Sequence, residues 1–194
     1  MTRISRDSLM TLEAYAKARP EFRSKVMAHK KSRIVALGDH ITLIFEDELT
    51  VRYQIQEMLR VEKSFEEAGI MDELEAYGPL VPDGSNWKAT MMIEYPDPVQ
   101  RAEKLRQLKG IEKMVYIQVQ DCDRVHATAD EDLERENEEK TSAVHFLRFE
   151  LSSEMAQSVK RGAAISVGVE HPAYTAHTGA LPSSIRDSLA ADIA

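Results

Sequence analysis

Histidine and glutamate side chains recur along this sequence on separate predicted elements, and together they could hold a metal ion. The six histidines form neither H-x-x-x-H nor E-x-x-H, the spacings that put two ligands on one helical face, so the signatures of zinc proteases and ferritin-like di-iron proteins are absent. A metal site would have to be assembled from distant segments. Imidazole and carboxylate ligands suit iron, manganese or zinc, and bound water would be the nucleophile of such an enzyme. The candidate donors are His40, Glu46, Glu62, Glu94, His145 and His171.

Glu62 is predicted to face the protein core. Residues 50–65 place their apolar side chains within one arc of a helix at about 100° per residue, and Glu62 lies near the centre of that arc. A lone buried carboxylate costs several kcal/mol, so we expect Glu62 to be paired, metal-bound, protonated or able to reach water. The alternative is that the helix end frays and the carboxylate reaches solvent. The apolar members of the arc are Val51, Ile55, Met58, Leu59 and Phe65.

The opposite side of the same helix carries a polar ridge. Tyr53, Glu57 and Arg60 follow one another at i, i+4 and i+7, flanked by Gln54 and Gln56. Donors, acceptors and both signs of charge then lie within a few ångströms of one another. The ridge is therefore a candidate surface for a polar ligand or a protein partner, with a plain solvated face and a Glu–Arg pair as the alternative.

Two of the histidines have positions of their own in predicted strands. In "TSAVHFLRFEL", residues 141–151, His145 falls on the apolar side. An inward histidine is either a hydrogen-bonded core residue or, beside a buried carboxylate, the beginning of a metal or acid–base site. His171 stands at a strand end before a proline, where it either overhangs a cleft or simply ends the strand.

Composition limits the classes of function. The net charge is −8, with 33 acids against 25 bases, so we expect no binding to nucleic acid or to anionic membranes. Cys122 is the single cysteine, which rules out an internal disulfide, a C-x-x-C pair and a cysteine-ligated iron–sulfur cluster. No G-x-S-x-G or Walker motif occurs. Without a secretory signal or a membrane-spanning stretch, the expected location is the cytoplasm.

The elements that must position these residues alternate between strands and helices. Strands with polar and apolar sides next to hairpin-like turns favour an α+β fold with a mainly antiparallel sheet, and α/β is the alternative. Length and the absence of a linker predict a single domain over residues 1–194. Residues 130–140, rich in acids, are expected to be an exposed helix or loop. The predicted helices are 5–18, 20–33, 50–65, 98–108, 153–161 and 182–194, and the predicted strands are 40–47, 88–96, 114–119, 124–129, 141–151 and 163–174.

The segments "HITLIFEDELTVRYQIQEMLRVE", "LVPDGSNWKATMMIEYP", "DEDLERENEEKTSAVHFLRFEL" and "VGVEHPAY" resemble a bacterial family, domain of unknown function 3501, over nearly the whole chain. The family has no established activity and no catalytic residues to carry over. Its members tend to be encoded near rubrerythrin-like proteins and iron–sulfur oxidoreductases. The resemblance therefore implies an accessory protein of a redox or oxidative-stress system that binds a polar ligand, a metal or a redox protein partner; the alternative is the metal-dependent enzyme.

Overall fold

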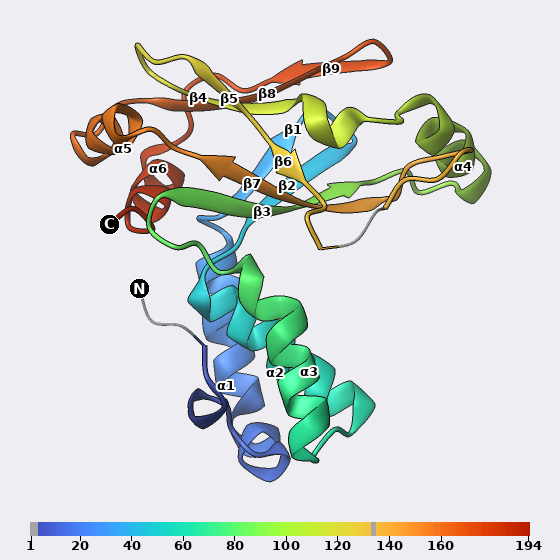
Figure 1. Ribbon diagram of the computed structural model, residues 1–194, viewed down its shortest axis with the longest axis vertical. Helices are drawn as coiled ribbons and strands as arrows, with labels where there is room; N and C mark the ends of the chain where they lie inside the picture. The colour runs from blue at the N-terminus through green and yellow to red at the C-terminus, as the bar shows by residue number, and fades with distance from the viewer. Residues whose placement is uncertain (1–3, 133–134) are drawn as a thin grey trace.

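Two antiparallel β-sheets packed face to face form the larger part of the protein (Figure 1). The computed structural model describes residues 4–132 and 135–194. The five-stranded sheet has the order β1-β2-β3-β7-β6, and the four-stranded sheet has the order β5-β4-β8-β9. All strand pairs in these ranges are antiparallel, which confirms the predicted α+β class. The strands are β1 Ile34–Leu37, β2 Ile41–Phe45, β3 Asn86–Ile93, β4 Val115–Val119, β5 Arg124–His126, β6 Thr128–Ala129, β7 Val144–Glu150, β8 Ile165–His171 and β9 Tyr174–His177.

The main core lies between the two sheets and follows from the period of two in the strands. In β2 the side chains of Ile41, Leu43 and Phe45 are buried, whereas the residues between them are half-buried. β7 has the same pattern, with Leu147 and Phe149 facing inward. The other face of the five-stranded sheet is therefore left for a different contact.

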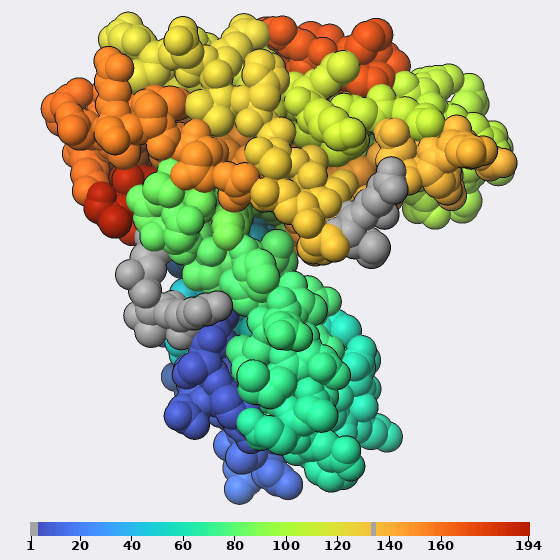
Figure 2. Space-filling model, in the orientation of Figure 1, coloured from blue at the N-terminus to red at the C-terminus, as the bar shows by residue number. Residues whose placement is uncertain are grey.

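Three helices form an arm that projects from the sheets (Figures 1 and 2). Helix α1 leads into β1, and α2 and α3 lie between β2 and β3, so the α2–α3 turn lies at the end of the arm away from the sheets. The arm has a small core of its own, made by Ile4, Leu9, Val51, Ile55, Leu59 and Ile70. The α-helices are α1 Leu12–Lys30, α2 Glu48–Glu62, α3 Glu67–Tyr77, α4 Pro98–Gln107, α5 Ser153–Lys160 and α6 Ser183–Ala190; short 3-10 helices are Arg6–Ser8, Gly78–Leu80 and Ile111–Met114.

Described residues 4–33 contain one long α-helix, which corrects the prediction of two helices that meet at Pro20. The side chain of Thr11 caps α1 by accepting a hydrogen bond from Ala14 N at 3.2 Å, whereas Ser5, where the first predicted helix begins, precedes a 3-10 helix. Pro20 lies exposed inside α1. A proline there removes one helix hydrogen bond, and the packing of α1 against α2 offsets that loss.

Three smaller predictions also change. Residues 124–129 are two short strands in different sheets, because the chain crosses from one sheet to the other at Ala127. Strands β1 and β9 were not predicted. The described residues 130–132 and 135–140 contain no helix, and Asp130 is half-buried rather than exposed.

Candidate functional site

A groove lies where the arm meets the outer face of the five-stranded sheet. Because the inward residues of β2, β3 and β7 fill the main core, the residues between them face outward, and helices α2 and α3 cover this face only in part. The groove contains a cavity of about 310 Å³ with a mostly apolar lining. The apolar lining residues are Ile44, Val51, Leu80, Met92, Val144 and Phe146. The polar or charged ones, including Tyr77 with its hydroxyl, are Lys30, Glu46, Thr50, Gln54, Tyr77 and Thr90.

Glu46 is the acidic group of this cavity. Its carboxylate accepts hydrogen bonds from Thr50 Oγ1 at 2.5 Å and from Thr90 Oγ1 at 2.7 Å. Its backbone N–H donates to Lys88 O at 2.8 Å, which fixes the residue against β3. The side chain is half-buried, and within the described ranges no salt bridge neutralises its charge. A carboxylate held by two neutral hydroxyls in an apolar cavity favours the approach of a cation.

A second cavity of about 500 Å³ continues the groove along the sheet, and Leu80 and Phe146 line both. Here the guanidinium of Arg148 binds Glu131 at 2.7 and 2.9 Å and Glu150 at 2.6 Å, and these carboxylates raise the pKa of Arg148. Burial lowers the pKa of Lys88, whose ammonium donates to a backbone carbonyl. Acidic side chains outnumber basic ones in this cavity, so the groove as a whole favours a cationic ligand.

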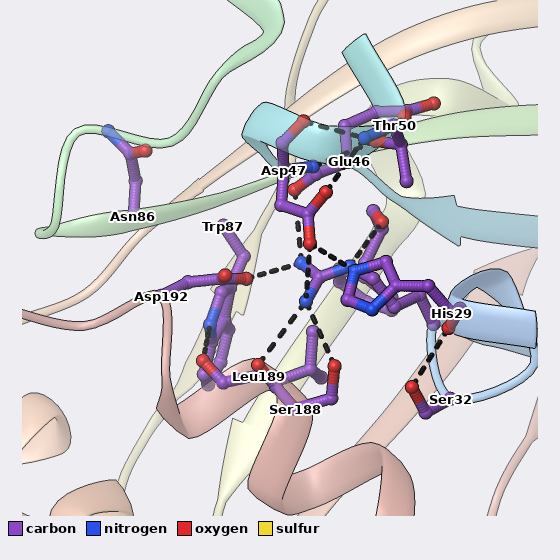
Figure 3. Close-up of polar contacts among 12 residues, drawn as sticks. His29, Ser32, Glu46, Asp47, Thr50, Asn86, Trp87, Ser188, Leu189 and Asp192 are labelled. Carbon is purple, nitrogen blue, oxygen red and sulfur yellow. Dashed lines mark hydrogen bonds and ion pairs between the residues drawn. The ribbon is translucent and has the colours of Figure 1, made fainter. Parts of the chain in front are cut away.

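A buried arginine, Arg33, joins the arm to the sheets next to the groove; its partners Asp47, Ser188 and Asp192 are labelled in Figure 3. Arg33 is 1% exposed and donates to Phe45 O at 2.8 Å and to Glu46 O at 3.0 Å at the end of β2. It also donates to Ser188 Oγ at 3.0 Å on α6 and forms an ion pair with Asp192. Burial raises the pKa of Asp192 to about 6, although Arg33 acts in the opposite direction.

Asp47 joins this cluster to helix α2. It is the N-cap of α2 and accepts a hydrogen bond from Thr50 N at 2.9 Å. His29 Nε2 lies 2.5 Å from Asp47 Oδ2, and Arg33 Nη1 lies 3.4 Å from the same oxygen (Figure 3). Burial acts to raise the pKa of Asp47, but Arg33, the Thr50 amide and His29 together lower it. The sequence did not predict a role for His29, Arg33 or Asp47. The position of Asp47 just before a helical pattern could have identified it as an N-cap.

The comparisons with known proteins add a family and a relative. The family model described as "Protein of unknown function (DUF3501)" matches residues 3–193. The chain belongs to this family. A crystal structure of a protein of unknown function from Burkholderia pseudomallei K96243 is similar to it, with 53% sequence identity, complete coverage of both chains and a TM-score of 0.95. The comparison with curated proteins gives no match.

In this DUF3501 chain the predicted polar ridge is mainly an internal contact between α1 and α2. Tyr53 is 8% exposed and packs edge-on against Phe22 of α1, with ring centroids 6.0 Å apart. Glu57 accepts hydrogen bonds from Tyr15 at 2.7 Å and from Arg19 at 2.7 and 2.9 Å. Arg19 is the main cause that lowers the pKa of Glu57 to about 2, and burial together with Glu57 raises the pKa of Tyr15.

The other ridge residues lie in three different environments. Arg60 is exposed and donates to Glu57 at 3.3 Å. Gln56 is fully buried, and its side-chain oxygen accepts a hydrogen bond from Met10 N at 2.7 Å. Gln54 alone of the five lines the groove. The ridge residues therefore do not share one open surface, because α1 covers Tyr53 and Glu57. The residue pattern of α2 could not reveal this contact with another helix.

Glu62 does not face the core, and the alternative prediction, in which the carboxylate at the helix end reaches solvent, is the one that holds. Glu62 is exposed at the last position of α2, and Phe65, placed in the same arc by the pattern, is 75% exposed. The helix ends there at Lys63 in a left-handed conformation, so the arc does not continue. His145 lies in β7, in the sheets, and does not share a site with Glu62. The structure therefore gives no support to the alternative of a metal enzyme with Glu62 and His145 as ligands, because the two side chains do not meet.

His145 is a buried, fully bonded residue. Its Nδ1 lies 2.6 Å from Asp130 Oδ2, and its Nε2 lies 3.0 Å from both Thr141 Oγ1 and Ser142 O. Asp130 Oδ1 also accepts the backbone N–H of Phe146 at 3.0 Å. This histidine–carboxylate pair, whose partner the sequence did not identify, fixes the loop that follows β6 onto β7.

Two of the remaining metal-donor candidates, His40 and Glu94, are neighbours: His40 Nδ1 lies 3.0 Å from Glu94 O, and the Glu94 N–H donates to His40 O. His171 is buried, with its Nε2 3.0 Å from Lys109 O, and accepts the Ala173 N–H at Nδ1. His40 stacks on Tyr95, with ring centroids 4.0 Å apart, and Glu94 accepts the Thr42 hydroxyl at 2.6 Å. Across the described part of the chain, no three histidine, cysteine, aspartate or glutamate side chains form a group that could hold a metal ion. None of the described helices is long and apolar enough to cross a bilayer.

Proposed function

We propose that this protein is an accessory binding protein whose groove receives a cationic group on an apolar stem, as a lysine or arginine side chain of a partner protein presents. The observation that carries this proposal is the Glu46 carboxylate, held by two threonine hydroxyls and lacking a salt bridge among the described residues, at the side of an apolar cavity. A ligand with an ammonium or guanidinium head would compensate that charge while its stem covers the apolar residues.

The acidic character of the second cavity supports the same class of ligand. Asp83, Glu131 and Glu150 line it, and the whole chain has a net charge of −8, which favours encounter with a basic partner surface. The redox class of that partner is an expectation from the genomic neighbours of the family. The groove specifies only the charge and the shape of what it binds.

Titration with hexylammonium, followed by the NMR signals of methyl groups in Ile44, Met92 and Val144, tests the groove. We expect these signals to shift with hexylammonium and not with hexanoate, and Glu46→Gln to weaken binding about tenfold. Glu94→Gln is the matched control, because Glu94 also accepts a threonine hydroxyl but lies outside the groove. Equal binding by wild type and Glu46→Gln would refute the proposal.

Affinity capture from a bacterial extract under anaerobic conditions tests the redox class separately. The wild-type chain should retain a rubrerythrin-like or iron–sulfur protein, and Glu46→Gln should retain less of it. Retention of neither class by the wild type would remove the redox expectation and leave the cation groove to be decided by the NMR titration.

A further inference from the structure

The end of the arm exposes large apolar side chains. Of the seven that are exposed in the described residues, Val61 at 63% and Phe65 at 75% lie at the α2–α3 turn, whereas Met71 at 48% lies further along α3 and lines a cavity with Pro79 and Lys88. Exposed apolar residues that gather in one place mark interaction surfaces far more often than scattered ones do. This region lies at the opposite end of the arm from the groove (Figure 1).

Phe65 has a possible partner within the arm and does not use it. Lys63 ends α2 in a left-handed conformation with φ 55°, and Glu66 is the N-cap of α3. Phe65 therefore occupies the position before the N-cap, from which an apolar side chain often packs against the fourth residue of the helix. That residue, Ile70, is 6% exposed within the core of the arm, whereas Phe65 points to solvent.

The charges around these residues define what could cover them. Residues 61–75 contain six acids and one base, Lys63. The pKa of Glu73 is raised, first by burial and then by the nearby carboxylates of Glu62 and Asp72. A second copy of the same chain would bring like charges together, and an anionic membrane surface would be repelled. A basic surface would gain attraction from the same carboxylates.

We infer that the end of the arm, defined by Val61 and Phe65 with their acidic neighbours, is a docking surface for a basic amphipathic segment of a partner protein. Apolar side chains of that segment would cover Phe65, and lysine or arginine side chains on its flanks would approach Glu62 and Glu66. This surface is separate from the groove and does not depend on the function proposed for Glu46.

Binding of a short fluorescent peptide of leucine and lysine, patterned as an amphipathic helix, tests this inference by fluorescence anisotropy. The expected result is saturable binding that weakens with added salt, with Phe65→Ser and Val61→Ser each about tenfold weaker than wild type. Val99→Ser is the matched control, because Val99 is 77% exposed on α4, away from the arm. A peptide with glutamate in place of lysine should not bind.

Several outcomes would overturn the inference. Unchanged affinity of Phe65→Ser, or equal binding of the glutamate peptide, would show that the end of the arm does not select a basic segment. Loss of binding in Glu46→Gln but not in Phe65→Ser would place the peptide in the groove instead. Sedimentation velocity that finds a dimer of the wild type and a monomer of Phe65→Ser would assign the surface to a second copy of the chain.

Discussion

Arg33 shows how much one side chain can decide in this fold. It lies three residues after helix α1 and contacts the end of β2, the N-cap of α2, helix α6 and Asp192, which is 159 positions away from Arg33 in the sequence. A guanidinium can bind several planar acceptors at once, and here two carboxylates and three backbone carbonyls surround it. Its removal would take a buried donor from all of these acceptors, although Asp47 would keep the Thr50 amide and His29 as partners.

Replacement of Arg33 by methionine should lower the free energy of unfolding by about 3–5 kcal/mol, because the carboxylates of Asp47 and Asp192 lose their buried cation. Urea unfolding measures this change. Arg6→Met is the control: Arg6 pairs with Glu67 at the surface, with side-chain exposures of 36% and 66%, so we expect a loss below about 1 kcal/mol. Similar losses in the two variants would contradict the role of burial.

At the scale of elements, the contact between α1 and α2 depends on a partly buried cluster of polar groups as well as on apolar packing. Glu57 is at its centre, between Tyr15 and Arg19 of α1. Because these hydrogen bonds need the ionised carboxylate, the contact is linked to pH.

Glu57 should stabilise the fold above pH about 4.5, its ordinary pKa, and lose that contribution as the pH falls toward its folded value of about 2. The sign follows because the unfolded chain takes up the proton first. We expect Glu57→Gln to cost about 1–2 kcal/mol at pH 7 and much less near pH 3, measured by urea unfolding. Glu21→Gln, on an exposed part of α1, is the control. A cost that does not change with pH would contradict this linkage.

Pro20 gives a second prediction at this scale. Pro20→Ala restores a backbone N–H inside α1 but makes the unfolded chain more flexible, and we expect a net gain of about 1–2 kcal/mol in the free energy of unfolding. Thermal or urea unfolding measures it. Pro98→Ala should gain nothing, because Pro98 is at the first position of α4, where an N–H has no helix partner. Destabilisation by Pro20→Ala would mean that α1 needs the proline.

At the scale of the whole molecule, two hydrophobic cores of unequal size are linked by the contacts of Arg33 with Asp47 and Asp192. The main core collects residues from both sheets and from α4, α5 and α6, whereas the core of the arm is small. The single-domain prediction for residues 1–194 stays a prediction that depends on how firmly Arg33 and its partners couple these cores.

Hydrogen exchange measures that coupling. Amides of α2 and α3 should open at a lower free energy than those of β4 and β8, because fewer apolar side chains support them. Ile55→Ala, which removes a fully buried side chain of the arm, should cost about 2–5 kcal/mol and reduce protection in the arm first. An equal loss of protection in β4 and β8 would indicate one cooperative unit.

The sequence by itself determined most elements and the inward or outward direction of the strand residues. The period of two predicted correctly that His145 faces the core, and the helix predicted over residues 153–161 is confirmed as Ser153–Lys160, with Ser152 as its cap. These are local properties, because side-chain alternation and capping depend on neighbours within a few positions. The acid-rich, single-cysteine composition also follows from the sequence alone.

The tertiary structure decided which of those side chains meet. Periodicity around α2 could not reveal that α1 covers Glu57, that Glu62 lies beyond the packed part of the helix, or that Arg33 reaches Asp192. The tertiary structure also brought Glu46, which follows β2, and Thr90 of β3 to one cavity. Contacts between residues far apart in the chain depend on how whole elements pack, and that packing leaves no periodic signal in any single segment.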